Sequence, residues 1–236
     1  MANSKFEYVR NFETQSTLLP STYIVVRLDG RGFHRISTHY NFAKPNDIRA
    51  LNLSNAAALN VCRELKDVLV AYGESDEYSF ILRRETTLFN RRAEKLISTF
   101  VSLYTAHYIA LWPKFMTDTP LDFKCIPTFD GRAVCYPTLA IVKDYLSWRF
   151  VDTHINNLYN TVFWTLVLKG GMTTTEAEKK LSGTFSADKN EILWKDFGIN
   201  YNDEPEIFKK GSLIFKGKIR HCDVVKGIDE FFEGCT

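Results

Sequence analysis

The stretch VVRLDGRGFH, residues 25 to 34, joins an apolar run to an aspartate that is followed by two glycines around an arginine. The β-branched and apolar residues of Tyr23–Leu28 predict a buried strand. Side chains alternate along a strand, which places Val25, Arg27 and Asp29 on one side of it. The strand is therefore expected to end by presenting a carboxylate on a flexible, cationic turn.

The segments that follow show strand and helix periodicities in a defined order. Apolar residues at a helical spacing mark two helices, and a Gly- and Asp-bearing turn, GESD, joins two strand-like runs as a hairpin. The predicted elements are a strand at 23–28, a helix at 48–65, strands at 67–72 and 77–82, a helix at 89–112 that stops at Pro113, and a strand at 129–137. This βαββαβ order predicts an α+β fold with a four-stranded antiparallel sheet and two helices on one face.

The remainder of the chain is predicted to be mostly helical. An apolar stripe from Ile155 to Val167 ends at Gly170 and Gly171, and Thr173–Glu176 has the pattern of a capping box that opens another short helix. No linker-like or low-complexity stretch separates the two parts. We therefore expect a core at residues 1–137 and, at 138–236, a mainly helical extension that packs on it.

Two carboxylates are expected to converge at one edge of this sheet. In the split βαβ order the first and third strands are neighbours, so Asp29 at the end of one and Asp76 at the start of the other can meet. Like charges in proximity repel, and divalent cations bound between them explain such a pair best. Hard oxygen ligands suit Mg²⁺. Asp76 is preferred to Glu77 as a ligand because the two alternate in direction, and whether Glu77 binds metal stays open.

The turn after Asp29 suits a phosphate-containing ligand. Its glycines let the backbone approach a triphosphate, the Gly30 carbonyl can serve a metal, and the following amides form an anion-binding concavity. Two ions about 3.5 to 4 Å apart can polarise a phosphoryl centre and neutralise a leaving pyrophosphate. The candidate cations for the phosphates are Arg27, Lys44, Arg92 and Lys95.

Composition narrows the class of protein further. The chain has 236 residues, 45% hydrophobic and 25% charged, with a formal net charge of +2, so nucleic-acid binding must come from local patches. The segment Lys209–His221 has five Lys or Arg and no acid, which favours a polyanion partner. Five cysteines without a C-x-x-C pair indicate a reducing compartment. With no secretory signal or membrane span, we expect a cytoplasmic or nuclear protein that needs no membrane.

Six motifs in order, RLDGRGFHR, NFAKPND, GESDEYSF, KDYLSWR, HINNLYNT and ADKNEIL, give the chain a clear resemblance to the histidine-tRNA guanylyltransferase family. The resemblance implies a polymerase palm-like catalytic core and a nucleotidyltransferase that adds one guanylate to the 5′ end of histidine tRNA, in the 3′-to-5′ direction. It implies ATP-dependent activation of the tRNA 5′-phosphate, attack by the GTP 3′-hydroxyl and removal of pyrophosphate, with two Mg²⁺ ions, in a homotetramer.

The resemblance also assigns roles to individual residues. Asp29 and Asp76 match metal-binding carboxylates, Gly30 matches a carbonyl ligand, and Glu77 matches an acidic neighbour needed for activity. The implied nucleotide contacts are Asp29, Gly30, Arg31, Gly32, Phe33, His34, Ser75 and Asp76. Further positions match a second triphosphate site or the tRNA end, namely Lys44, Asp47, Arg92 and Lys95. Positions implicated in tRNA handling, all in the extension, are His154, Asn157, Lys189 and Asn190.

Two other classes of protein are compatible with the same element order. A non-catalytic RNA-binding module has this topology, but it reads RNA with aromatic residues where this chain has Asp29, Asp76 and Glu77. A palm-fold nucleotide cyclase has similar carboxylates, but it does not need HINNLYNT or ADKNEIL. The sequence leaves open which residues read the anticodon and whether other tRNAs are repaired at their 5′ ends.

Overall fold

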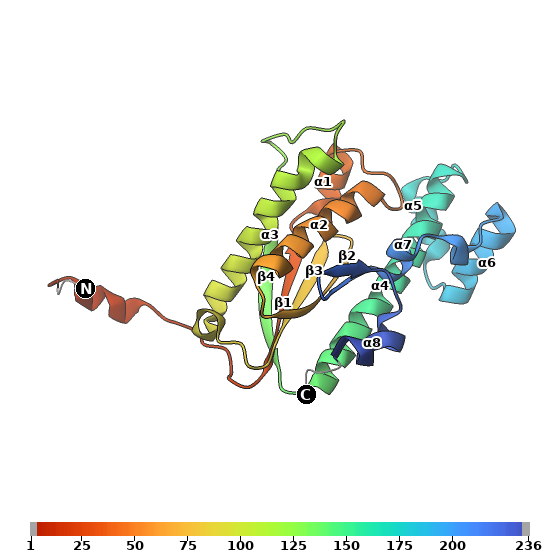
Figure 1. The fold of residues 1–236 in the computed structure, drawn as a ribbon. Coiled ribbons are helices and arrows are strands. Elements are labelled where there is room, and N and C mark those ends of the chain that lie inside the picture. Colours follow the sequence, from red (N-terminus) through yellow and green to blue (C-terminus); the bar gives the residue numbers. More distant parts are fainter. Residues whose placement is uncertain (1–3, 233–236) are drawn as a thin grey trace.

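The computed structural model describes residues 4–232, and its centre is a six-stranded antiparallel sheet (Figure 1). The strand order is β4-β1-β3-β2-β5-β6. The strands are β1 (Tyr23–Gly30), β2 (Val68–Glu74), β3 (Glu77–Leu82), β4 (Phe129–Tyr136), β5 (Ser212–Phe215) and β6 (Lys218–Arg220). The first and third strands are neighbours as predicted, with Leu28 opposite Tyr78.

Eight α-helices and three short 3₁₀ helices are present within residues 4–232. The α-helices are α1 (Phe33–His39), α2 (Ile48–Glu64), α3 (Ala93–Phe115), α4 (Leu139–Leu168), α5 (Thr174–Leu181), α6 (Ser186–Phe197), α7 (Glu206–Lys210) and α8 (Val224–Phe232). The 3₁₀ helices are η1 (Glu7–Phe12), η2 (Leu88–Arg91) and η3 (Tyr201–Asp203). None of these helices is long and apolar enough to cross a membrane.

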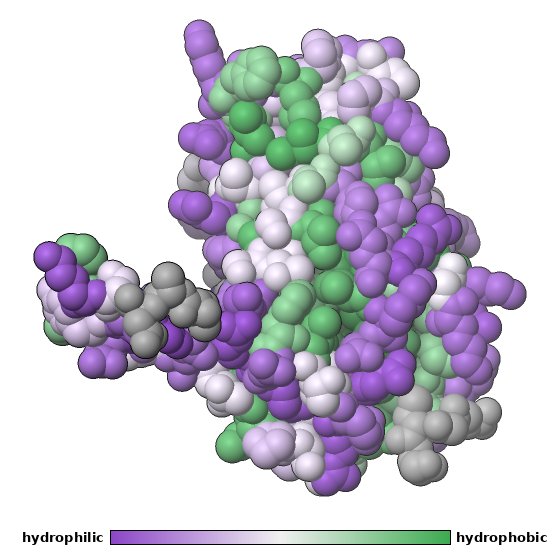
Figure 2. Space-filling view, turned by 60° about the vertical axis from the view of Figure 1, so that its left-hand side comes forward, coloured by the Kyte–Doolittle hydropathy of each residue, from purple (hydrophilic) through white to green (hydrophobic). Residues whose placement is uncertain are grey.

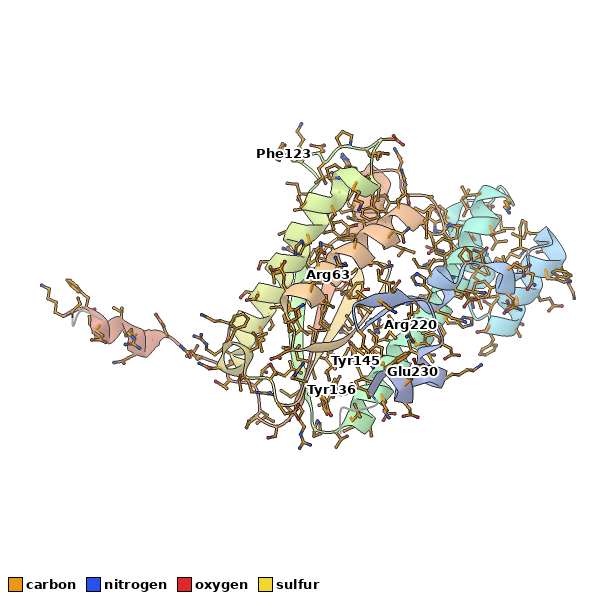
Figure 3. The ribbon with its side chains drawn as sticks, viewed as in Figure 1. Arg63, Phe123, Tyr136, Tyr145, Arg220 and Glu230 are labelled. Atoms are coloured by element: carbon orange, nitrogen blue, oxygen red, sulfur yellow. The ribbon has the colours of Figure 1, made fainter. Side chains whose placement is uncertain are left out.

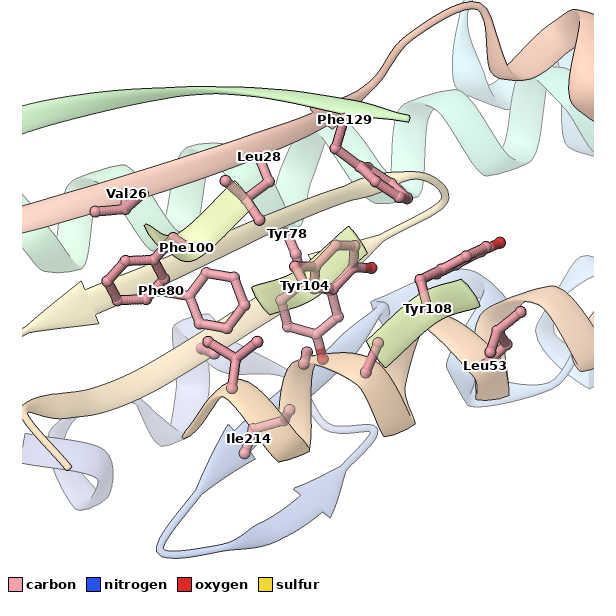
Figure 4. Close-up of a cluster of buried hydrophobic side chains, with 14 of the residues drawn as sticks. Val26, Leu28, Leu53, Tyr78, Phe80, Phe100, Tyr104, Tyr108, Phe129 and Ile214 are labelled. Atoms are coloured by element: carbon pink, nitrogen blue, oxygen red, sulfur yellow. The ribbon is translucent and has the colours of Figure 1, made fainter. Parts of the chain in front are cut away.

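One face of the sheet packs against α2 and α3, as the βαββαβ order predicts. Its core is rich in aromatic rings: Phe80 from β3 meets Phe100 of α3 at 5.2 Å between centroids, and Phe129 of β4 meets Tyr104 at 4.8 Å (Figure 4). All four rings are buried. Because aromatic side chains remove a large apolar area from water, this layer holds the strand ends rigidly.

The other face is covered by α4 and α8. Val25, Ile81 and Leu213 point into this second core, where they join Leu146 of α4 and Phe231 of α8. Strand β1 is therefore buried on both faces, which accounts for its nearly continuous apolar sequence. The extension thus packs on the sheet and covers its second face.

A third, smaller cluster forms where the C-terminal half of α4 meets α5 and α6. Leu158, Val162, Leu181 and Leu193 are buried there. The predicted capping box is present, because the Glu176 amide donates to the Thr173 hydroxyl at 3.3 Å and the Thr173 amide donates to the Glu176 carboxylate at 2.9 Å.

The prediction of four strands was incomplete. The β5–β6 hairpin lies within a segment that the sequence marks only as basic, and it extends the sheet beyond β2 through pairs such as Tyr72 with Leu213. The helix predicted from residue 89 begins at Ala93, because Phe89 and Asn90 have left-handed φ angles of 51° and 55°. It also runs past Pro113 to Phe115; a proline in the last turn breaks few helical hydrogen bonds.

The N-terminal segment that carries η1 projects away from the rest of the chain (Figures 1 and 2). Its large side chains Phe6, Tyr8, Val9 and Phe12 are all exposed. The cysteines at 62, 125, 135 and 222 are free, as expected, and Cys235 lies outside the described residues.

Candidate active site

The structure brings Asp29 and Asp76 together where β1 ends and the turn between β2 and β3 begins. A Cβ built on Gly30 would stand 2.7 Å from Oδ2 of Asp76 and 2.3 Å from the Phe33 ring. Only a glycine fits here, and its absence of a side chain lets the turn carboxylate lie against the end of β1. Ser75 turns the chain at this point with a left-handed φ of 49°.

The electrostatics of this carboxylate pair suit a cation. Burial raises the pKa of Asp76, and the nearby charge of Asp29 raises it further, against hydrogen bonds from Ser75 and its own amide. Among the ion pairs of residues 4–232, none involves Asp29 or Asp76. Two half-buried like charges that lie together and both offer hard oxygen atoms fit a divalent cation such as Mg²⁺.

The protein supplies only part of a coordination shell at this place. Over residues 4–232 no group of three or more His, Cys, Asp or Glu side chains is arranged to hold a metal ion. Mg²⁺ commonly takes one or two carboxylates and completes its shell with water and substrate phosphates. The residues present therefore fit an ion that arrives with a phosphate-bearing substrate.

Glu77 belongs to a buried ion-pair network on the α4 side of the sheet. Arg149 of α4 bridges three carboxylates, with Nε 2.8 Å from Glu77, Nη2 2.7 Å from Glu74 and Nη1 3.2 Å from Asp152. Arg27 lies 3.7 Å from Glu77 as well. Sequence reasoning missed Arg149 and Glu74, although Arg149 closes the quoted KDYLSWR motif.

The network perturbs the protonation of its members. Burial raises the pKa of Glu74 to about 7, although Thr153 and Arg149 stabilise its charged form. Burial also raises the pKa of Glu77, against the attraction of Arg149 and Arg27. Arg149 is 8% exposed at its side chain, so breaking its contacts leaves charges that water cannot reach.

A cleft of about 650 Å³ opens beside Asp76. It gathers many of the predicted nucleotide contacts, since its walls include Phe33, His34, Lys44, Asp47 and Ser75. The wall residues that were not predicted include Tyr108 from α3 and Asn160 and Trp164 from α4. A cleft of this size, with convergent polar groups at one end, suits a nucleotide.

Lys44 and Asp47 have different situations within this cleft. The Lys44 ammonium donates to the Ser37 hydroxyl at 3.0 Å and lies 5.4 Å from the Trp164 ring, and burial lowers its pKa. Asp47 caps α2 by accepting from the Arg49 amide at 2.9 Å and from the Arg49 guanidinium at 2.7 Å. Asp47 therefore organises the cleft wall, while Lys44 is the cation at its surface.

Three further predicted residues sit in the turn after β1 or on the sheet. The Arg31 amide donates to the Thr128 carbonyl at 2.9 Å, and Gly32 begins α1 with a left-handed φ of 62°. Arg27 lies on the α4 side beside Glu77, away from the walls of the 650 Å³ cleft.

Arg92 and Lys95 are not brought to this cleft within the chain. Arg92 forms an isolated backbone β-bridge with Thr17, which lies just before the start of β1. Its neighbour Arg91 donates a hydrogen bond to the Thr22 carbonyl at 2.9 Å. The carboxylates lie at the opposite end of β1, which spans roughly 23 Å at the usual rise per residue. One chain therefore cannot present Arg92, Lys95 and Asp29 to one phosphate group.

The four residues expected to handle tRNA gather on α4 and α6. His154 and Asn190 line a second cleft of about 310 Å³, together with the exposed ring of Trp194. Lys189 donates to the Thr184 carbonyl at 2.8 Å. Asn157 is buried; its amide donates to the Tyr201 hydroxyl at 3.0 Å and its carbonyl accepts from Asn46 at 2.8 Å, so it holds the extension against the cleft wall.

Comparison with known proteins identifies the family. The family model described as tRNAHis guanylyltransferase matches residues 6–137, and the model described as Thg1 C terminal domain matches residues 140–229. The tRNA(His) guanylyltransferase of Kluyveromyces lactis is 64% identical over 236 residues, which cover 99% of this chain and 100% of that protein. That of Saccharomyces cerevisiae is 60% identical over the same length.

Solved structures show the same fold. The crystal structure of the Saccharomyces cerevisiae enzyme superimposes with a TM-score of 0.92 at 58% identity, covering 96% of this chain and all of that one. A bacterial guanylyltransferase-like protein in complex with ATP has a TM-score of 0.83 at 23% identity, over 98% of this chain and 99% of that one. Fold and relatives together define a nucleotidyltransferase. The chain belongs to the tRNA(His) guanylyltransferase family, which excludes the binding module and the cyclase.

Proposed function

We propose that this protein adds a single guanylate to the 5′ end of histidine tRNA, with ATP and GTP as substrates. The observation that carries the proposal is the convergence of Asp29 with Asp76, which lines the 650 Å³ cleft, while neither acid has an ion-pair partner among residues 4–232. The family supports the tRNA substrate, since the relatives at 64% and 60% identity are tRNA(His) guanylyltransferases.

The proposed reaction has three steps. The 5′-monophosphate of the tRNA attacks the α-phosphorus of ATP, so that an adenylylated 5′ end forms and pyrophosphate leaves. The 3′-hydroxyl of GTP then attacks the activated tRNA phosphate, loses its proton and displaces AMP. Hydrolysis finally removes pyrophosphate from the new 5′ end and leaves one added guanylate.

The protein's own residues position these groups. Asp29, the Gly30 carbonyl and Asp76 would hold up to two Mg²⁺ ions, which stabilise charge on the phosphoryl oxygens when bound. Lys44 offers its ammonium to a triphosphate in the cleft, next to His34 and Ser75. Glu77 is fastened by Arg149 and Arg27, so its proposed role is to fix the strand end that carries Asp76.

The extension is proposed to contact the tRNA through His154, Lys189 and Asn190. His154 and Asn190 line the 310 Å³ cleft, which has an exposed tryptophan as a stacking surface. Because Asn157 is buried, its proposed contribution to tRNA handling is to hold this part of α4 in place.

The test uses purified protein, Mg²⁺, ATP and labelled GTP with 5′-monophosphorylated histidine tRNA, beside a tRNA with another anticodon. Growth of the histidine tRNA by one nucleotide at its 5′ end, without growth of the second tRNA, is the expected result. Tight binding of tRNA without any growth would overturn the proposal.

A further inference from the structure

A second surface of the molecule carries charge that the active site does not use. Three cations, Arg63, Lys66 and Lys216, stand around a groove of about 470 Å³ whose floor includes Val68, Ile214 and Phe231. We call these six residues the basic groove. It lies between the end of α2, where Figure 3 labels Arg63, and the β5–β6 hairpin.

The cations of the basic groove have no acidic partner among residues 4–232. Arg63 donates only to the Asn60 side chain at 3.3 Å, and neither Lys66 nor Lys216 forms an ion pair. The neighbouring acids are directed elsewhere, because Glu64 pairs with His107 and Glu230 pairs with Arg220. No carboxylate of residues 4–232 lines the groove, so the field of these residues there is positive.

The hairpin turn fixes one of these charges in place. Lys216 and Gly217 form a two-residue turn with φ angles of 47° and 72°, while Phe215 pairs with Lys218 across it. Both turn positions are left-handed, a geometry that favours glycine or asparagine over lysine. Lysine is disfavoured in this backbone conformation, so its presence at the rim of a positive groove indicates that its charge has a functional role.

We propose that the basic groove binds the phosphate backbone of the substrate RNA. The proposal rests on the proposed function. We infer the kind of partner from the charge of the groove, because unpaired exposed cations around an apolar floor attract a polyanion. The basic composition of Lys209–His221 indicates the same kind of partner. The groove lies at the start of β2 and the carboxylates near its end, roughly 20 Å away. The contacted phosphates therefore lie away from the reacting 5′ end.

The test compares two double variants of the full-length protein that lose the same charge. Lys66→Gln/Lys216→Asn removes two groove cations, and asparagine suits the left-handed turn, so the fold is retained. Lys114→Gln/Lys124→Gln removes two exposed lysines elsewhere. Binding of 5′-monophosphorylated histidine tRNA is measured by fluorescence anisotropy between 50 and about 300 mM KCl, without ATP. Thermal melting confirms that both variants are folded.

The groove variant is expected to bind the tRNA about 10-fold more weakly, with its log affinity–log salt slope reduced by about 1 for each lysine. The control variant keeps the wild-type slope, and the KM for GTP stays unchanged in both. Equal slopes for the wild type and the groove variant would overturn the proposal. The proposal would also be overturned if the groove variant lost binding to phosphatidylserine vesicles but bound tRNA as the wild type does, which would assign the groove to a lipid surface.

Guanylate addition at saturating tRNA, measured on the wild type, separates this inference from the proposed function. Normal addition with an unchanged slope in the groove variant rejects the groove alone. A reduced slope in a protein that adds no guanylate rejects the proposed function and leaves the groove as an RNA site.

Discussion

The acidic residues at this end of the sheet have different roles because their surroundings differ. Asp76 is half-buried beside Asp29 and forms no ion pair within residues 4–232, whereas Glu77, the next residue, is held by two arginines. Asp76 lies in the turn before β3 and lines the cleft, whereas Glu77 begins the strand and contacts Arg149 of α4. Asp76 therefore needs a bound cation to balance its charge, whereas the charge of Glu77 is already balanced by arginine side chains.

Replacing Asp76 should separate activity from stability. Asp76→Asn is expected to lower guanylate addition by about 100-fold or more, and to raise the melting temperature in EDTA. Because the folded-state pKa of Asp76 is raised, its ionisation costs stability as pH rises above its ordinary pKa. The gain in melting temperature should therefore be larger at pH 7 than at pH 4.

The control is Asp118→Asn, which removes an exposed acid. Mg²⁺ should raise the melting temperature of the wild type and of this control, but not that of Asp76→Asn. Near-normal turnover by Asp76→Asn would contradict the metal assignment.

Arg149 is expected to contribute more to stability than a surface ion pair. Arg149→Met removes the cation that pairs with Glu74 and leaves Glu77 with Arg27 alone, and such a loss in a buried network costs about 3–5 kcal/mol of the free energy of unfolding. Arg149→Lys should restore only part of it, because an ammonium cannot bridge three carboxylates. Urea unfolding of the two variants measures both effects, and a cost below about 1 kcal/mol for Arg149→Met would count against the network.

His154 should titrate below the usual range of a histidine. Burial lowers its pKa, and the charge of Lys209 lowers it further. The unfolded chain then binds a proton more readily than the folded one, so His154 reduces stability as pH falls through about 6.5. NMR titration of the histidine rings should show this low pKa, and Lys209→Gln should raise it; an unchanged pKa in that variant would exclude the contribution of Lys209.

At the scale of elements, the order βαββαβ and the edge where the carboxylates meet were predictable from sequence. The buried run of β1, the GESD turn and the two apolar helical stripes are local patterns with periods of 2 and 3.6. Strand β5 was not predictable in the same way. It has four residues flanked by lysines, and its pairing partner β2 lies more than 130 residues earlier in the chain.

The hairpin offers a direct test of its place in the sheet. Ile214 and Ile219 face each other across β5 and β6, but Ile214 is 2% exposed and Ile219 is 37% exposed. Ile214→Ala should cost about 2–5 kcal/mol of the free energy of unfolding, because it opens a cavity in the core that α2 and α3 share. Ile219→Ala is the matched control, with an expected cost below about 1 kcal/mol. Similar costs for both would mean that β5 does not pack as described.

At the scale of the whole molecule, the projecting N-terminal segment is proposed to mediate assembly into a homotetramer. In a 3₁₀ helix residues three apart lie above one another, so Phe6, Val9 and Phe12 form one apolar edge on η1. Their side chains are exposed in the single chain, Phe12 to 79%. A second copy of the chain would remove this edge from water.

If the proposed tetramer forms through this edge, Phe6→Ser/Phe12→Ser should shift the protein to smaller species in size-exclusion chromatography with light scattering. Phe123→Ser, which removes a phenylalanine that is 93% exposed on another part of the surface, is the control. If the double variant and the control both elute as the wild type does, the segment has no part in assembly.

The sequence by itself determined the strand that ends in Asp29, the glycine beside it and the turn that carries Asp76, because each depends on neighbouring residues whose spacing sets backbone conformation. Only the tertiary structure decided that Arg149 joins Glu74 to Glu77 and that Arg92 lies at the far end of the sheet. The reason is physical. An ion pair or a buried charge depends on distance and burial in three dimensions, and these are set by packing between segments far apart in the chain.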